Sequence, residues 1–344
     1  MMSEKISITD IVEFNPKRPV KKGTVAPFIE MAALPTSQRD VDYVLQKEFK
    51  SGGAKFTNGD TLFARITPCL ENGKTALVSG FKENINGFGS TEFIVMSPKY
   101  PEYDSKFIYY LARHPEFRDY AKAHMEGTSG RQRVSWQSLS EFKYSFPEKD
   151  HRKKIGNLLS KFDDKISNNT AMNSTLERIA QRIFKSWFVD FDPVKANAEG
   201  VPFDGLSPEI QALFPNELEE SELGMIPKGW EVKSLDEIAH FLNGLACQKH
   251  RPKEGEAPLP VIKIAEMRAG YQEKTNEASP SVNPKYIVND GDFLFSWSGS
   301  LTTCFWSHGP GVLNQHLFKV TSEDFPKWFF SMWVNIHLAE FIRI

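Results

Sequence analysis

Residues 151–191 read HRKKIGNLLSKFDDKISNNTAMNSTLERIAQRIFKSWFVDF, and this stretch decides how the chain is organised. Apolar side chains recur along it at helical spacing. Five positions seven residues apart form one seam: Ile155, Phe162, Asn169, Leu176 and Ile183. A seven-residue repeat is typical of a coiled coil, although an ordinary long core helix remains an alternative. Roughly 40 residues at 1.5 Å each predict a helix about 60 Å long.

The seam carries one polar position, and acidic residues follow it. A buried amide at Asn169 could fix the register and the number of helices, at a cost in stability. Asp192-Pro193 is expected to end the helix. Residues 192–223 hold one lysine and eight acidic residues, so they are predicted to form an acidic surface linker.

The segments on either side of the helix resemble each other. Five blocks recur in the same order at offsets of 221 to 233 residues: 8–14 with 235–241, 27–32 with 260–265, 59–64 with 291–296, 90–95 with 314–319, and 106–111 with 327–332. This pattern indicates two copies of one module. The alternative is that the blocks are generic strand patterns.

Each copy has the punctuation of short strands followed by a helix. Gly59-Asp60 and Gly291-Asp292 are turn dipeptides before apolar runs, and helices are expected near 104–123 and 325–342. The predicted fold class is α+β, with two mixed α/β target-recognition domains joined by a long coiled-coil-type helix. The predicted parts are a first domain at 1–148, the helix at 149–191, the linker at 192–223, and a second domain at 224–344.

Composition restricts the function classes. A net charge of −2 disfavours a protein whose whole surface binds nucleic acid, but the acidic linker hides a mildly basic front part of the chain. The three cysteines are far apart and no Cys/His cluster occurs, so neither disulfides nor a metal site are expected. With no apolar targeting segment and no run of about 18 apolar residues, we expect a cytoplasmic protein without a membrane partner.

Four stretches resemble the specificity subunit of type I restriction–modification enzymes. They are GDTLFARITPCLENGK at 59–74, GTSGRQRVSW at 127–136, FKSWFVDFDPV at 184–194 and GMIPKGWEV at 224–232. The resemblance implies two recognition domains, each followed by a conserved helix, with the two helices packed antiparallel. It implies double-stranded DNA as the ligand, with each domain reading half of a split site.

The resemblance also implies partners: two methyltransferase subunits and restriction (motor-nuclease) subunits. Those partners would use S-adenosylmethionine, ATP and Mg, and no cofactor is expected in this chain. The second copy stops before a counterpart of the loop at 127–136 and of the helix, so we expect a C-terminally incomplete second domain. The uncovered apolar stripe of the helix is then expected to pair antiparallel with the same helix of a second copy, giving a homodimer.

Candidate DNA contacts follow from the chemistry of base edges and phosphates. In the first domain they lie in one loop and at one strand end: Thr128, Ser129, Arg131, Gln132 and Arg133, and then Arg65, Asn72 and Lys74. In the second domain they are Trp297, Ser298, Ser300, Asn314, Gln315 and His316. The alternatives are a merely solvated loop, an Arg65 paired with a carboxylate such as Glu92, and a His316 buried in the core.

No catalytic constellation is expected, because the sequence has neither a complete cofactor motif nor a convincing set of metal ligands. The other function classes are a stand-alone DNA-binding regulator and a fragment of a DNA methyltransferase or nuclease. A regulator should bind DNA tightly alone, whereas a methyltransferase should carry a cofactor motif.

Overall fold

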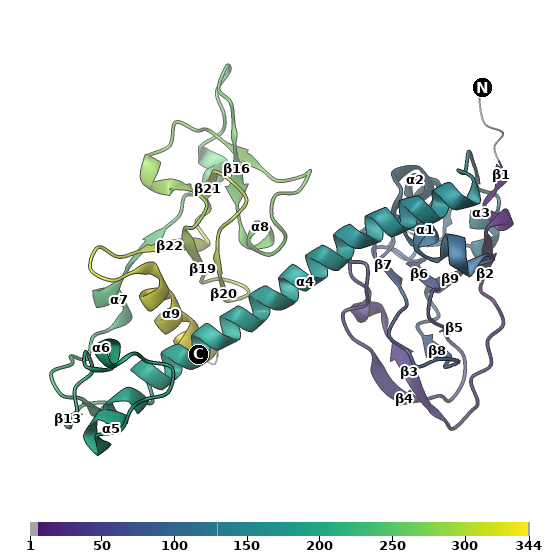
Figure 1. The fold of residues 1–344 in the computed structure, drawn as a ribbon. Coiled ribbons are helices and arrows are strands. Elements are labelled where there is room, and N and C mark those ends of the chain that lie inside the picture. Colours follow the sequence, from purple (N-terminus) through teal and green to yellow (C-terminus); the bar gives the residue numbers. More distant parts are fainter. Residues whose placement is uncertain (1–5, 129, 343–344) are drawn as a thin grey trace. The chain divides into compact units, whose positions relative to one another are not determined.

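The long helix is the first feature of the computed structural model, which describes residues 6–128 and 130–342. Helix α4 (Lys149–Phe188) is continuous over 40 residues, as predicted, and is the long teal helix of Figure 1. It ends three residues before the predicted end. Phe191 adopts a left-handed backbone conformation with φ 57°, which a right-handed helix cannot include. The chain divides into two compact units, Met1–Ser174 and Thr175–Ile344.

The first unit contains two four-stranded sheets, which we call module 1 together with the helices before α4. One sheet has the order β2 (Val12–Phe14), β9 (Phe93–Pro98), β6 (Thr61–Ala64), β7 (Thr75–Leu77). The other has the order β4 (Leu45–Glu48), β3 (Val25–Ile29), β8 (Gly87–Gly89), β5 (Ala54–Phe56). Neighbouring strands are antiparallel except β3 and β8, which are parallel.

The sheet containing β6 is buried on both faces. Phe63 and Ile94 point to the core shared with the helices, whereas Leu62 and Val95 point to the core shared with the second sheet. Side chains alternate between the faces of a strand. All four residues of β6 are therefore buried, which explains why this strand reads as a continuous apolar run.

Module 1 is completed by helices and short strand pairs. The helices are α1 (Pro101–Arg113), α2 (Pro115–Ala123) and α3 (Trp136–Ser140). The strand pairs are β1 (Ile6–Ser7) with β12 (Lys143–Tyr144) and β10 (Met125–Glu126) with β11 (Arg133–Val134). Between β10 and β11 lies the loop that the sequence singled out as a DNA contact.

Helix α1 packs closely on the first turns of α4 (Figure 1). The buried residues of α4 here are Arg152, Gly156 and Ser160, four residues apart and therefore on one face. The Arg152 guanidinium donates to the carboxylate of Asp104 on α1, with the Nε–Oδ1 distance at 2.5 Å. A Cβ at Gly156 would lie 2.9 Å from the backbone nitrogen of Phe107. Glycine thus permits the close approach of the two helices.

Gly156→Ala is expected to destabilise the chain. The added methyl group would push against the α1 backbone, and overpacking of this kind costs about 1–3 kcal/mol, which outweighs the gain in helix propensity of about 1 kcal/mol or less. Urea unfolding followed by circular dichroism measures the change. Ser174→Ala, at an exposed position of the same helix, is the control for propensity alone. Equal stabilisation by both substitutions would contradict the close-contact explanation.

The second unit repeats the topology of module 1. One sheet has the order β15 (His240–Asn243), β22 (Leu317–Thr321), β19 (Phe293–Ser296), β20 (Thr302–Phe305). The other has the order β17 (Glu277–Ala278), β16 (Leu259–Ile262), β21 (Gly311–Leu313), β18 (Ile287–Val288). The parallel pair recurs as β16 and β21. The prediction of two mixed domains joined by a long helix is confirmed, and we call this second copy module 2.

Module 2 also contains helices α7 (Leu235–Ile238), α8 (Ile264–Ala269) and α9 (Lys327–Phe341). Phe330 and Val334 of α9 share a core with Phe293 and Phe295 of β19. The opposite face of β19 contributes Leu294 to the core shared with the second sheet. This alternation matches that of β6, and all four residues of β19 are likewise buried.

Residues 192–223 differ from the expected surface linker because much of this stretch is folded. Helix α5 (Asp192–Glu199) buries Pro193, Val194 and Ala196. A further helix follows, α6 (Pro208–Gln211), and then a hairpin of β13 (Leu218–Ser221) and β14 (Gly224–Pro227). The acidic composition predicts an exposed segment, but a few apolar side chains are enough to anchor α5.

The apolar stripe of α4 stays exposed in the described structure. The exposed fraction of the side chains includes 63% for Phe162, 56% for Leu176 and 44% for Ile183. Ile155, at 37%, is the least exposed of the predicted apolar seam residues, and Asn169 is exposed too. None of the helices in the described part of the chain combines the length and apolar character needed to cross a bilayer.

Candidate nucleic-acid interface

In module 1 the residues that follow β6 contact Glu92, just before β9, and the loop between β10 and β11. The Arg65 amide donates to the Glu92 carbonyl at 3.0 Å, and the Val134 amide donates to the Arg65 carbonyl at 3.0 Å. The backbones of Thr67 and Gln132 are also linked, at 3.0 Å. The structure therefore brings Arg65 together with the loop at 127–134, although they are more than 60 residues apart in sequence.

Glu92 pairs with Arg133 and not with Arg65. The guanidinium of Arg133 donates from Nε and Nη2 to the carboxylate, with distances of 2.8 to 3.0 Å. These hydrogen bonds raise the pKa of Arg133 above its usual value. The alternative that Glu92 forms an ion pair with Arg65 is therefore wrong. Arg133 is held beside the loop base, which restrains it from reaching far outward.

Arg131, like Arg133, is an exposed cation of the loop. Its amide closes a turn by donating to the Thr128 carbonyl at 3.0 Å, and its side chain is exposed. Gly127 and Gly130 have φ values of 121° and 79°, in the region that favours glycine. Ser129 lies outside the described residues. The loop thus presents Arg131 beside the backbone-anchored Gln132.

The other candidates at this strand end differ in availability. Lys74 donates from Nζ to the carbonyl of Met31 at 2.8 Å, so its ammonium group satisfies the backbone of the short helix Met31–Ala33. Lys74 is therefore engaged inside the module, which the sequence could not reveal. Asn72 is exposed in the turn between β6 and β7.

In module 2 the corresponding loops hold an aromatic and amide cluster. The Trp297 indole donates to Asn243 Oδ1 at 3.2 Å. His316 Nδ1 lies 3.0 Å from Ser298 Oγ, and its Nε2 lies 3.3 Å from Gln315 Nε2. His316 is exposed, so the alternative of a core histidine is wrong.

The other two candidates of module 2, Asn314 and Ser300, make contacts within their own loops. Asn314 is only 7% exposed, and its side-chain oxygen accepts the His316 amide at 3.3 Å. Asn314 therefore holds the backbone of the loop at His316 in the structure. Ser300 is exposed, and its carbonyl accepts from Ser296 Oγ at 3.0 Å.

Strand register makes the two sites equivalent. Ala64 pairs with Phe93 in module 1, and Ser296 pairs with Leu317 in module 2. The next residues outward therefore correspond, Arg65 to Trp297 and Glu92 to His316. The same two positions carry charged side chains in one module and aromatic side chains in the other.

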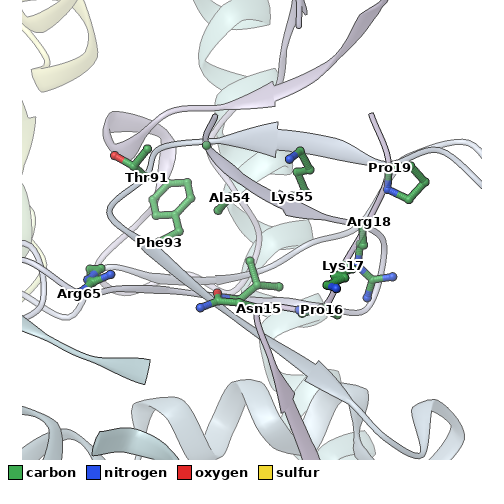
Figure 2. A pocket seen from close by; sticks show the side chains of 12 residues that line it. Asn15, Pro16, Lys17, Arg18, Pro19, Ala54, Lys55, Arg65, Thr91 and Phe93 are labelled. Atoms are coloured by element: carbon green, nitrogen blue, oxygen red, sulfur yellow. The ribbon is translucent and has the colours of Figure 1, made fainter. Parts of the chain in front are cut away.

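A cleft beside Arg65 was missed by the sequence analysis. It has a volume of about 610 Å³, and its lining includes Lys17, Arg18, Lys55, Arg65 and Thr91. Figure 2 shows Arg65 on one side and Lys17, Arg18 and Lys55 on the other. The run Pro16-Lys17-Arg18-Pro19 was a signal available in the sequence, but nothing there placed it near Arg65.

Comparison with known proteins identifies the family to which both modules belong. The family model described as "Type I restriction modification DNA specificity domain" matches residues 2–178 and 227–334. The chain belongs to this family.

Curated relatives of this specificity-domain family are similar in sequence. The type I restriction enzyme HindI specificity subunit of Haemophilus influenzae is 31% identical over 249 residues, covering 61% of this chain and 53% of that protein. The MjaIX specificity subunit of Methanocaldococcus jannaschii is 30% identical over 199 residues, covering 57% of this chain and 42% of that protein. The chain thus spans about half the length of these relatives.

Solved structures give a weaker likeness. The type I restriction-modification S subunit from M. genitalium aligns with a TM-score of 0.48 and 14% identity, covering 99% of this chain and 78% of that one. The HsdS subunit from Thermoanaerobacter tengcongensis aligns with a TM-score of 0.36 and 15% identity, covering 94% of this chain and 75% of that one.

Among the described residues, no group of three or more His, Cys, Asp or Glu is placed to hold a metal ion.

Proposed function

We propose that the chain reads a split DNA site as a specificity subunit of a type I restriction–modification system. One observation carries the proposal. The two specificity-family modules share a strand topology, but at equivalent loop positions one carries Arg65 and Glu92 and the other Trp297 and His316. Shared frames with different loop chemistry are what two half-sites of different sequence require, because base edges are distinguished by donor and acceptor pattern.

We assign the chemistry of the system to partners. Two methyltransferase subunits and restriction (motor-nuclease) subunits would join the chain, bringing S-adenosylmethionine, ATP and Mg. No catalytic role is assigned to this chain. The names of the curated relatives as specificity subunits support this division of labour.

The test is selection of preferred sequences from a randomised duplex pool, by the purified chain and by the chain assembled with methyltransferase subunits. A split motif with two specified halves and a constant unspecified spacer is expected. A single unbroken motif would favour a stand-alone regulator, and the absence of any motif would contradict the proposal. Assays of methyl transfer with S-adenosylmethionine on the same preparation check that the chain alone is inactive.

Within the first half-site, Arg131→Ala is expected to weaken specific binding by about 1–3 kcal/mol and to relax one base position. Arg131 is exposed on a loop whose base is fixed by backbone hydrogen bonds, so its guanidinium is free to approach a base edge. Fluorescence anisotropy with the selected duplex and single-base variants measures both effects.

Arg133→Ala serves as the comparison for Arg131→Ala. Because Glu92 already holds the Arg133 guanidinium, this substitution is expected to act less on base preference than Arg131→Ala. If binding is unchanged in both variants, the loop is a solvated surface and makes no contact with DNA.

A further inference from the structure

We infer that the cleft of module 1 binds the sugar–phosphate backbone of DNA, with Arg65, Lys55 and Lys17 donating to phosphate oxygens. The inference rests on the proposed function and adds a site and a chemical role to it. It concerns only the first unit of the chain, so it is independent of how the units are arranged.

The shape of the cleft suits an extended anionic strand. It has a volume of about 610 Å³, and cationic side chains lie on opposite sides of it in Figure 2. Arg65 comes from the end of β6, Lys55 from β5 and Lys17 from the segment after β2. An anion that spans the cleft can therefore meet cations from three separate elements.

The lining of the cleft supplies cations and, in the part of the chain that the structure describes, no anion of its own. Among the described residues that line it, none is a carboxylate. Arg18 is neutralised by Asp60 at 2.7 Å, and Glu92, next to the lining residue Thr91, is occupied by Arg133. Lys55 lies over the ring of Phe49 at 5.3 Å, which leaves its hydrogen-bond donors available.

The side chain of Arg65 gives the most specific indication of a phosphate ligand. Its Nε is buried and has no hydrogen-bond partner among the residues that the structure describes. A buried donor without an acceptor is costly, and guanidinium groups match phosphate oxygens in geometry and charge. The cleft therefore holds a donor whose hydrogen-bond requirement an incoming phosphate would satisfy.

A phosphate fits this cleft better than a base edge. Base edges that present donors need an acceptor from the protein, but the side-chain oxygen of Asn15 already accepts the Val95 amide at 2.9 Å. The remaining polar side chains that line the cleft are the cations and the hydroxyl of Thr91. Cations that contact phosphates position DNA without reading its sequence.

Module 2 lacks the same feature at the equivalent position. Trp297 replaces Arg65, and its indole N–H donates to Asn243. The strand position that carries a cation in module 1 thus carries an uncharged ring in module 2. Removing a cation from the cleft of module 1 should therefore change the salt dependence of DNA binding more than replacing Trp297 in module 2 does.

The experiment measures binding of the full chain to a short mixed-sequence duplex between about 50 and 200 mM salt. Arg65→Ala and Lys55→Ala are each expected to lower the slope of log affinity against log salt by about 0.9, because each removes one phosphate contact. Arg65→Lys should keep the slope. Lys122→Ala removes a cation on α2, outside the cleft, and should also keep it.

Two outcomes overturn the inference. Unchanged slopes in both Arg65→Ala and Lys55→Ala would show that the cleft meets no phosphate. A slope kept in Arg65→Ala with altered preference at one base position would make Arg65 a base contact. Selection from the randomised duplex pool separates the claims. A wild-type chain that selects a split motif upholds the proposed function whatever the slopes are, whereas one that binds no duplex, alone or assembled with methyltransferase subunits, overturns both.

Discussion

Arg152→Met is expected to destabilise the first unit by about 3–5 kcal/mol, the largest loss that a single substitution should produce here. The Asp104 side chain is fully buried, and Arg152 is its ion-pair partner from α4. Arg152 also donates to the Pro147 carbonyl at 2.8 Å. Methionine fills a similar volume but leaves a charged carboxylate in the interior without a partner.

Urea unfolding, with hydrogen exchange of the α1 amides, locates the effect of this substitution. Lys153→Met is the matched control, because Lys153 pairs with Glu102 on the same two helices but both are exposed. An exposed pair of this kind contributes about 0–1 kcal/mol. Asp104→Leu combined with Arg152→Met should recover most of the lost stability. Equal effects of the two methionine substitutions would refute the account.

A second large effect is expected at the apolar stripe of α4, through which we propose that two copies pair antiparallel. Leu176 and Ile183 are 56% and 44% exposed, and burial of each in a dimer would contribute at least about 1.5 kcal/mol. Leu176→Asp with Ile183→Asp should therefore raise the dimer Kd by roughly 100-fold or more. Sedimentation equilibrium at micromolar concentration measures the change.

The control for the dimer places the same charges on another face of α4. Ser174→Asp with Gln181→Asp are also seven residues apart and exposed, but they lie outside the stripe. They should leave the dimer intact. A wild-type monomer under these conditions would rule out pairing of two copies, and a dimer unaffected by the stripe substitutions must use another surface.

The fold could be predicted because its signals are local. The seam from Ile155 to Ile183 is written in one continuous segment, and the modules recur as whole blocks. The face of α4 that packs on module 1 could not be predicted this way. Arg152, Gly156 and Ser160 are polar or small, so a hydrophobicity pattern assigns them to solvent. In the structure α1 packs on Arg152 and Gly156, and Arg39 donates to Ser160.

The site was predicted only in part, because its contacts are tertiary. Arg65 and the loop near Arg131 were identified by residue type, and the structure brings them together. Residue type could not show that Glu92 holds Arg133, 41 positions away. Nor could it show that Lys74 serves the backbone, or that Lys17 and Lys55 line one cleft.

The burial of β6 and β19 on both faces has a consequence for evolvability. Every side chain from Thr61 to Ala64 and from Phe293 to Ser296 is buried, so nearly any exchange there disturbs two cores at once. One peptide bond further, Arg65 is only partly buried and Trp297 is exposed. Substitutions within β6 or β19 are therefore expected to disturb both cores, whereas substitutions at Arg65 or Trp297 are expected to leave both cores intact. The positions that the proposed recognition can vary thus begin directly beside the positions that the fold fixes.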